Sequence, residues 1–161
     1  MSAAHMVEHS VLSGVVAPAI VLAWIALRLP RPPIGPALLA WSAFVAAQWA
    51  FHLTPLLERS QDSFALHGAE HLAFLAIGVW FWAPVLGGDL GDPGRSLYLF
   101  TAAPAIDLVG VALMVRGEAG AGVAMLAGTL PIVLAAGIVT WRWLAREDGD
   151  TEMIERAHAA G

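Results

Sequence analysis

Two short motifs rich in metal-binding side chains stand out in the sequence. His67-Gly68-Ala69-Glu70-His71 carries two imidazoles and a carboxylate, and His5-Met6-Val7-Glu8-His9 repeats the same His-x-x-Glu-His pattern. Residues four apart on a helix share one face, about 6 Å apart, so the two histidines of each motif can chelate one ion. Imidazole is a ligand for zinc, copper, iron and nickel. The sequence therefore predicts a metal site built from two copies of one motif.

The candidate ligands are five histidines, supplemented by a methionine and three carboxylates. The predicted metal ligands are His5, His9, His52, His67 and His71; Met6 is an additional soft ligand, and Glu8, Glu70 and Asp107 are additional ligands or carboxylates that orient a ligand. Thioethers select Cu(I), and zinc sites are built from Cys, His and carboxylates rather than Met. A mixture of His and Met without Cys therefore favours copper, with zinc as the alternative.

The composition indicates that these residues are carried by a membrane protein. The 161 residues are 58% hydrophobic and only 13% charged, whereas a soluble domain carries about 25% charged residues. The net charge is −5, every basic residue is arginine, and no cysteine is present. These values argue against a nucleic-acid partner and exclude disulfide and thiolate chemistry.

Five apolar stretches are each about long enough to cross a bilayer, which needs about 20 residues. They predict an all-α, polytopic bundle of five transmembrane helices, near residues 10–29, 37–57, 64–86, 96–115 and 120–144. The helices form a single domain over residues 1–145. Residues 146–161 are predicted to be a short, acidic, cytoplasmic tail, frayed or lying at the membrane surface.

The arginines predict the orientation of this bundle. With the N-terminus outside and the C-terminus inside, six arginines fall on the inner side and only Arg59 and Arg116 on the outer side, as the positive-inside rule requires. The inner six are Arg28, Arg31, Arg95, Arg142, Arg146 and Arg156. This topology brings five of the six histidines into one leaflet, so we expect the metal site on the extracytoplasmic side of the plasma membrane.

Three segments carry a resemblance to a known family. They are the His5–His9 motif followed by an apolar helix with Pro18, the segment Trp49-Ala50-Phe51-His52-Leu53-Thr54-Pro55, and the His67–His71 motif with the downstream run Phe81-Trp82-Ala83-Pro84-Val85. In order and spacing they resemble the cytochrome c oxidase assembly factor family of CtaG-type membrane proteins, from about His5 to Arg146. The resemblance implies a polytopic membrane protein that binds copper and helps to insert it into an oxidase.

The function expected from these observations is copper acquisition or delivery, in assembly of cytochrome c oxidase or another copper enzyme, without enzymatic activity of its own. The expected partners are the lipid bilayer, a copper ion, an extracytoplasmic copper carrier and an oxidase subunit. The small residues Gly120, Ala124 and Gly128 permit close helix approach. Packing inside the bundle explains this pattern more simply than a homodimer does.

Three other functions stay open at this point. A zinc metallohydrolase is the runner-up, because His-x-x-Glu-His is also the inverted zincin motif, with the glutamate as general base. A haem-binding electron-transfer protein is another, because His52 and His71 at matched depth could be axial ligands. The third is a purely structural bundle, in which the histidines bind no metal.

Overall fold

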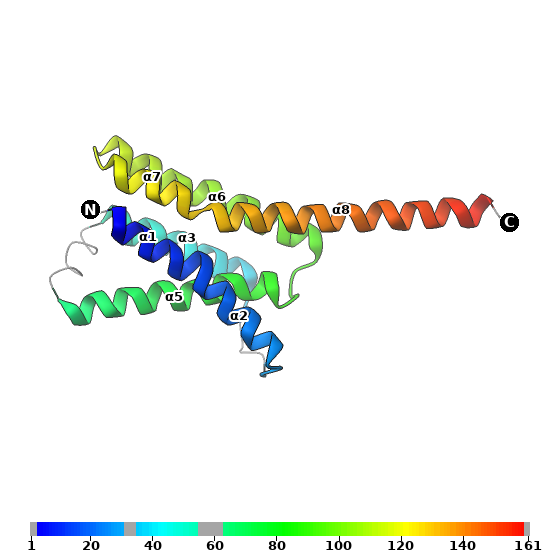
Figure 1. Ribbon diagram of the computed structural model, residues 1–161, viewed down its shortest axis with the longest axis horizontal. Helices are drawn as coiled ribbons and strands as arrows, with labels where there is room; N and C mark the ends of the chain where they lie inside the picture. The colour runs from blue at the N-terminus through cyan, green and yellow to red at the C-terminus, as the bar shows by residue number, and fades with distance from the viewer. Residues whose placement is uncertain (1–2, 31–34, 55–62, 160–161) are drawn as a thin grey trace.

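The computed structural model describes residues 3–30, 35–54 and 63–159, and within these ranges it contains helices and no strand. In chain order the helices are α1 (Ala3–Val11), the π-helical turn η1 (Leu12–Val16), α2 (Ala17–Ala26), α3 (Ala37–Leu53), α5 (Phe64–Leu86), α6 (Asp92–Val115), α7 (Ala119–Gly128) and α8 (Leu130–Ala159). The first three follow one another without a break, and α7 and α8 are separated only by Thr129 (Figure 1). The predicted all-α class is confirmed.

Four of the helical rods are long and apolar enough to cross a membrane. They are Ala3–Ala26, Phe64–Leu86, Asp92–Val115 and Ala119–Thr151. The fifth, α3, has 17 residues and is shorter than such a span. Large apolar side chains point away from the bundle on every rod, among them Leu22, Leu38, Leu72, Leu97 and Leu134, as expected of helices that face lipid.

The helix boundaries differ from the sequence prediction at both ends of the chain. The first helix begins at Ala3 rather than near residue 10, so the first His-x-x-Glu-His motif is part of the helix. A hydropathy window misses these first turns of the helix because His5, Glu8 and His9 lower the mean hydropathy there. At the other end, α8 continues to Ala159 through the predicted tail and extends beyond the bundle (Figure 1). The end predicted for the second helix at residues 55–57, and Arg31 and Arg59, lie outside the described residues.

A π-helical turn begins three residues after the first motif, at Leu12. Pro18 has no N–H with which to bond the carbonyl four residues back, and the preceding Ala17 N–H instead reaches Leu12, five residues back. The buried Trp82 indole donates a hydrogen bond of 2.8 Å to the Ser13 carbonyl in this turn. This bond therefore connects the first rod to α5 at Ser13, one turn after the first motif.

Close packing on small residues holds the first rod, Ala3–Ala26, against α5 and α7. A Cβ atom added to Gly78 of α5 would lie 3.0 Å from Ala17 Cβ and 3.1 Å from Ser13 Cα. On the opposite side, a Cβ atom on Gly128 of α7 would overlap the Ser10 hydroxyl. The small-residue face of α7 thus packs inside the bundle, and a homodimer remains a prediction.

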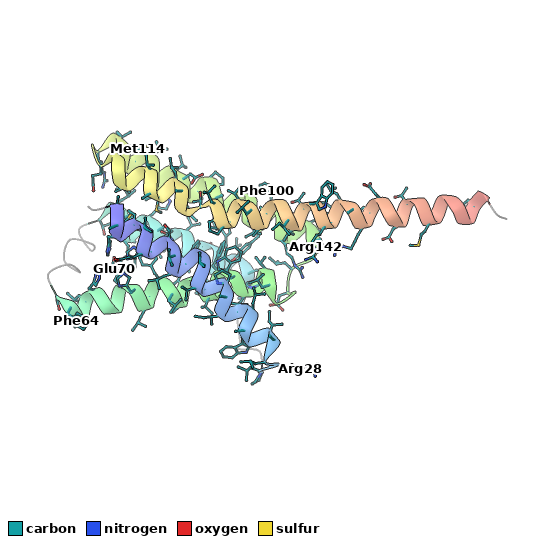
Figure 2. All side chains as sticks on the ribbon, viewed as in Figure 1. Arg28, Phe64, Glu70, Phe100, Met114 and Arg142 are labelled. Atoms are coloured by element: carbon teal, nitrogen blue, oxygen red, sulfur yellow. The ribbon has the colours of Figure 1, made fainter. Side chains whose placement is uncertain are left out.

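The two ends of the bundle carry different side chains. Glu70 and Met114 lie at one end, and Arg28 and Arg142 lie toward the other (Figure 2). At this second end, Asp92 at the start of α6 pairs with Arg95, at 3.6 Å, and with Arg146 of α8. The pair of Asp92 with Arg146 ties α8 to α6 at the end of the bundle that lies away from the motifs.

Candidate metal centre

The five histidines predicted as ligands converge where α1, α3 and α5 meet. The rings of His5 and His9 on α1 have centroids 4.2 Å apart, and those of His67 and His71 on α5 lie 4.3 Å apart. Across the two helices, His5 lies 5.3 Å from His67. The His52 ring, in the last turn of α3, lies 5.4 Å from that of His9. We call these five residues the histidine cluster.

Glu70 of the second motif faces the histidines of the first. Its Oε1 atom lies 3.7 Å from His5 Nε2 and 3.6 Å from His9 Nε2. Its Oε2 atom lies 3.9 Å from His67 Nδ1, three residues back on its own helix. One carboxylate therefore faces three imidazoles from two helices.

Glu8 of the first motif makes the reciprocal approach. Its Oε2 atom lies 3.6 Å from His71 Nε2 on α5 and 3.7 Å from His5 Nδ1 on its own helix. Each motif thus supplies its carboxylate to a histidine of the other motif. The two copies form one site across the α1–α5 interface rather than two separate sites.

Two overlapping groups within this site can hold an ion. His5, Glu8, His67 and His71 form one group, and His5, His9 and Glu70 form the other; in each, one nitrogen or oxygen atom per residue lies within 4.8 Å of all the others. The groups differ in burial, since the Glu8 side chain is 57% exposed and that of Glu70 only 1%. The second group is closed off from solvent by its own helices.

The interatomic distances suit an ion better than direct hydrogen bonds. His9 Nε2, His67 Nδ1 and His71 Nε2 are shielded from solvent and make no hydrogen bond within the described residues. Their carboxylate neighbours lie 3.6–3.9 Å away. Ligands about 2.0–2.1 Å from a tetrahedral ion stand about 3.3–3.4 Å apart. These carboxylate–imidazole pairs would therefore have to close by about 0.2–0.6 Å to share an ion, and all donor atoms of each group already lie within 4.8 Å of one another.

His52 supports His9 from the side away from Glu70. Its Nδ1–H donates a hydrogen bond of 2.7 Å to the Gln48 carbonyl, which can only accept. In a neutral ring, Nε2 then carries the lone pair, and it lies 3.3 Å from His9 Nδ1. His9 therefore donates from Nδ1 and presents the lone pair of Nε2 toward Glu70.

Aromatic packing holds the same ring in place. The Phe74 ring, one turn after His71 on α5, stacks on His9 with centroids 4.1 Å apart and planes inclined by 21°. It also lies 5.4 Å from the ring of His52. The His9 orientation is thus fixed by one hydrogen bond and one stacked ring.

The remaining predicted site residues lie elsewhere, and neither candidate group includes them. Met6 is completely buried in the hydrophobic core, while Ser10, one turn further on, packs against Gly128 of α7. Asp107 of α6 accepts a hydrogen bond of 2.9 Å from the buried Thr129 hydroxyl. Neither group contains His52 itself. Metal ligation by His52, Met6 or Asp107 stays a prediction.

Sequence reasoning missed three residues that shape the site: Gln48, Phe74 and Trp82. Gln48 stands four residues before His52 and Phe74 three residues after His71, spacings that share a helix face. Trp82 belongs to a run that sequence reasoning used as a family feature and did not connect with the site. Helical periodicity counted from each histidine would have found the first two.

Comparison with known proteins adds a family to this geometry. The sequence model of the cytochrome c oxidase caa3 assembly factor family (Caa3_CtaG) matches residues 1–119. This range contains the whole histidine cluster, both of its carboxylates, Phe74 and the Trp82 anchor. Searches among curated proteins and among solved structures gave no match.

Proposed function

The chain belongs to the cytochrome c oxidase caa3 assembly factor family, and we propose that it binds copper in the histidine cluster and delivers it during assembly of the oxidase or of another copper enzyme. The observation that carries this proposal is the reciprocal approach of Glu8 and Glu70 to the histidines of the opposite motif. Four imidazoles and two carboxylates then surround one small volume.

The donor chemistry supports copper as the cargo. The two candidate groups offer imidazole nitrogen and carboxylate oxygen, and the sequence has no thiolate. Imidazole suits copper and zinc, and copper binds more tightly than zinc at a shared nitrogen site. An excess of ligands around one ion also suits a carrier, because ligands can be exchanged one at a time with a donor or acceptor protein.

The topology we propose has five transmembrane helices, with α3 as the fifth, and the N-terminus on the extracytoplasmic side. The distribution of charge supports this orientation. Arg28 and Arg142 lie away from the cluster, whereas Arg116 donates to the Leu53 carbonyl, next to His52. Arg95 and Arg146 pair with Asp92, also at the distant end. The ion would then be exchanged with an extracytoplasmic carrier and an oxidase subunit.

The site is less well suited to a zinc hydrolase. A general base must reach a water molecule at an open ligand position. Glu70 is buried and faces two histidine nitrogens of α1, as expected for a ligand. The site is also less well suited to haem, which the alternative interpretation would place between His52 and His71. Both of these rings contact His9, so the His9 ring lies next to each proposed axial ligand.

Complementation of a strain that lacks the gene tests the proposed function. The variants are His67→Ala with His71→Ala, and, as a matched control, His158→Ala, which changes an exposed histidine far from the cluster. We expect the control to restore the copper content and activity of the oxidase, and the double variant to fail until copper is added to the medium. Equal restoration by both variants would contradict a role of the cluster in copper delivery.

A further inference from the structure

One imidazole ring connects the two candidate groups. His5 Nδ1 lies 3.7 Å from Glu8 Oε2, and His5 Nε2 lies 3.7 Å from Glu70 Oε1. The two nitrogens of an imidazole point away from each other, so each faces a different carboxylate. His5 is also the only residue that belongs to both groups found among the described residues.

The positions on the two sides of this ring differ in their access to solvent. On the Nδ1 side, Glu8 and His71 line a groove of about 420 Å³ between α1 and α5, with Val7, Val11 and Leu12. On the Nε2 side, His9 and Glu70 are 2% exposed each. We call these the exposed position, with Glu8, His67 and His71, and the buried position, with His9 and Glu70.

We propose that the copper ion is captured at the exposed position and then passed across the His5 ring to the buried position, where it is retained. A neutral imidazole has one lone pair, so His5 binds the ion through one nitrogen at a time. The transfer breaks the bond from copper to Nδ1 and forms a bond to Nε2. The proton on Nε2 passes to Glu70 Oε1, which faces it at 3.7 Å, then from Glu70 Oε2 to His67, whose side chain is 35% exposed, and from His67 to water. The same water returns one proton to Nδ1, so the ring stays neutral and Glu70 is again ionised.

This inference rests on the proposed function, because it requires that the cluster binds copper. It adds an order of events and a role for each carboxylate. Glu8 attracts the ion at the groove, where a charged side chain can remain hydrated. Glu70 neutralises the charge of the ion after transfer, where water does not reach it and an uncompensated charge would be costly.

Two paired variants separate the steps. Glu8→Gln with His71→Gln impairs the exposed position, and His9→Gln with Glu70→Gln impairs the buried one; both leave His5 in place. The purified proteins are mixed with a Cu(II) salt in detergent, with His158→Ala as the control. The measurements are bound copper per chain, the rate of loading and the rate of removal by a water-soluble chelator.

We expect the wild type and the control to bind one copper ion that the chelator removes slowly. The variant of the exposed position should still bind one ion but load at least about tenfold more slowly, the effect of about 1.4 kcal/mol on a barrier. The variant of the buried position should load at the wild-type rate and release copper to the chelator at least about tenfold faster. Equal, complete loss of copper in both variants, or two ions bound per wild-type chain, would overturn the transfer.

Freeze-quenched electron paramagnetic resonance of the wild type tests the same step without a substitution. We expect an early Cu(II) spectrum that converts to a different one as the ion moves. A single unchanging spectrum would overturn the transfer and leave copper binding intact. Absence of copper from the wild-type protein would instead remove the proposed function itself.

Discussion

Replacement of His52 by leucine should weaken copper binding without removing a copper ligand. His52 Nε2 accepts the hydrogen bond from His9 Nδ1–H. On the other side of the His52 ring, Nδ1–H donates to the Gln48 carbonyl, which leaves Nε2 as the acceptor. Leucine cannot accept this bond. His9 would then lose the partner that directs its Nε2 lone pair toward Glu70.

The expected size of the effect follows from the burial of the pair. His9 is 2% and His52 4% exposed, so water cannot replace the lost acceptor. A buried N–H without a partner costs about 1–3 kcal/mol. Loss of a hydrogen-bond partner of a metal-binding histidine typically lowers the affinity by about 10–100-fold, equivalent to about 1.4–2.7 kcal/mol. We therefore expect the Kd of His52→Leu to rise by about 10–100-fold.

Chelator competition gives the Kd, and pulsed electron paramagnetic resonance counts the nitrogens bound to Cu(II). His52→Gln is the matched variant, because its amide oxygen can accept from His9, and its Kd should stay near that of the wild type. The nitrogen count should be the same in all three proteins. An unchanged Kd in His52→Leu, or one nitrogen fewer in both variants, would refute the reasoning; the second result would make His52 a ligand.

Two further predictions concern packing. Gly78→Ala should destabilise the protein in detergent by about 1–3 kcal/mol and weaken copper binding, because the added methyl group meets Ser13 and Ala17 and pushes the first rod away from α5. Gly137→Ala, with no atom within 4 Å of the added Cβ, should not destabilise it. Equal denaturation midpoints of the two variants would contradict the packing described. Trp82→Phe should cost about 1–3 kcal/mol, since it leaves the buried Ser13 carbonyl without its indole donor; an unfolding free energy equal to that of the wild type would show that this bond does not anchor the turn.

Helix positions followed from hydropathy wherever apolar residues continue to the end of a helix. The third predicted helix, residues 64–86, agrees with α5, Phe64–Leu86. The method failed where a helix continues into polar residues. The first motif lies inside α1, and α8 extends through Arg146 and Glu147, where the Trp143 indole donates to the Glu147 carboxylate one turn later.

The convergence of histidines could be predicted from topology, but their pairing could not. Helix direction and depth alone bring His5, His9, His52, His67 and His71 to one end of the bundle. The approach of Glu70 to His5 and His9 depends on how α5 is rotated against the first rod, where Gly78 packs closely on Ala17. Similarly, the donor and acceptor roles of His52 depend on its side-chain rotamer, and spacing in the sequence does not specify a rotamer.

Metal content after competition between copper and zinc tests the central claim most directly. The wild type, the His67→Ala, His71→Ala double variant and the His158→Ala control would be purified in detergent, exposed to both metals and analysed by elemental mass spectrometry. We predict copper in the wild type and the control, and little or none in the double variant. Zinc in place of copper would favour the hydrolase interpretation. Absence of copper from the wild type, or equal copper in all three proteins, would contradict a copper site in the histidine cluster.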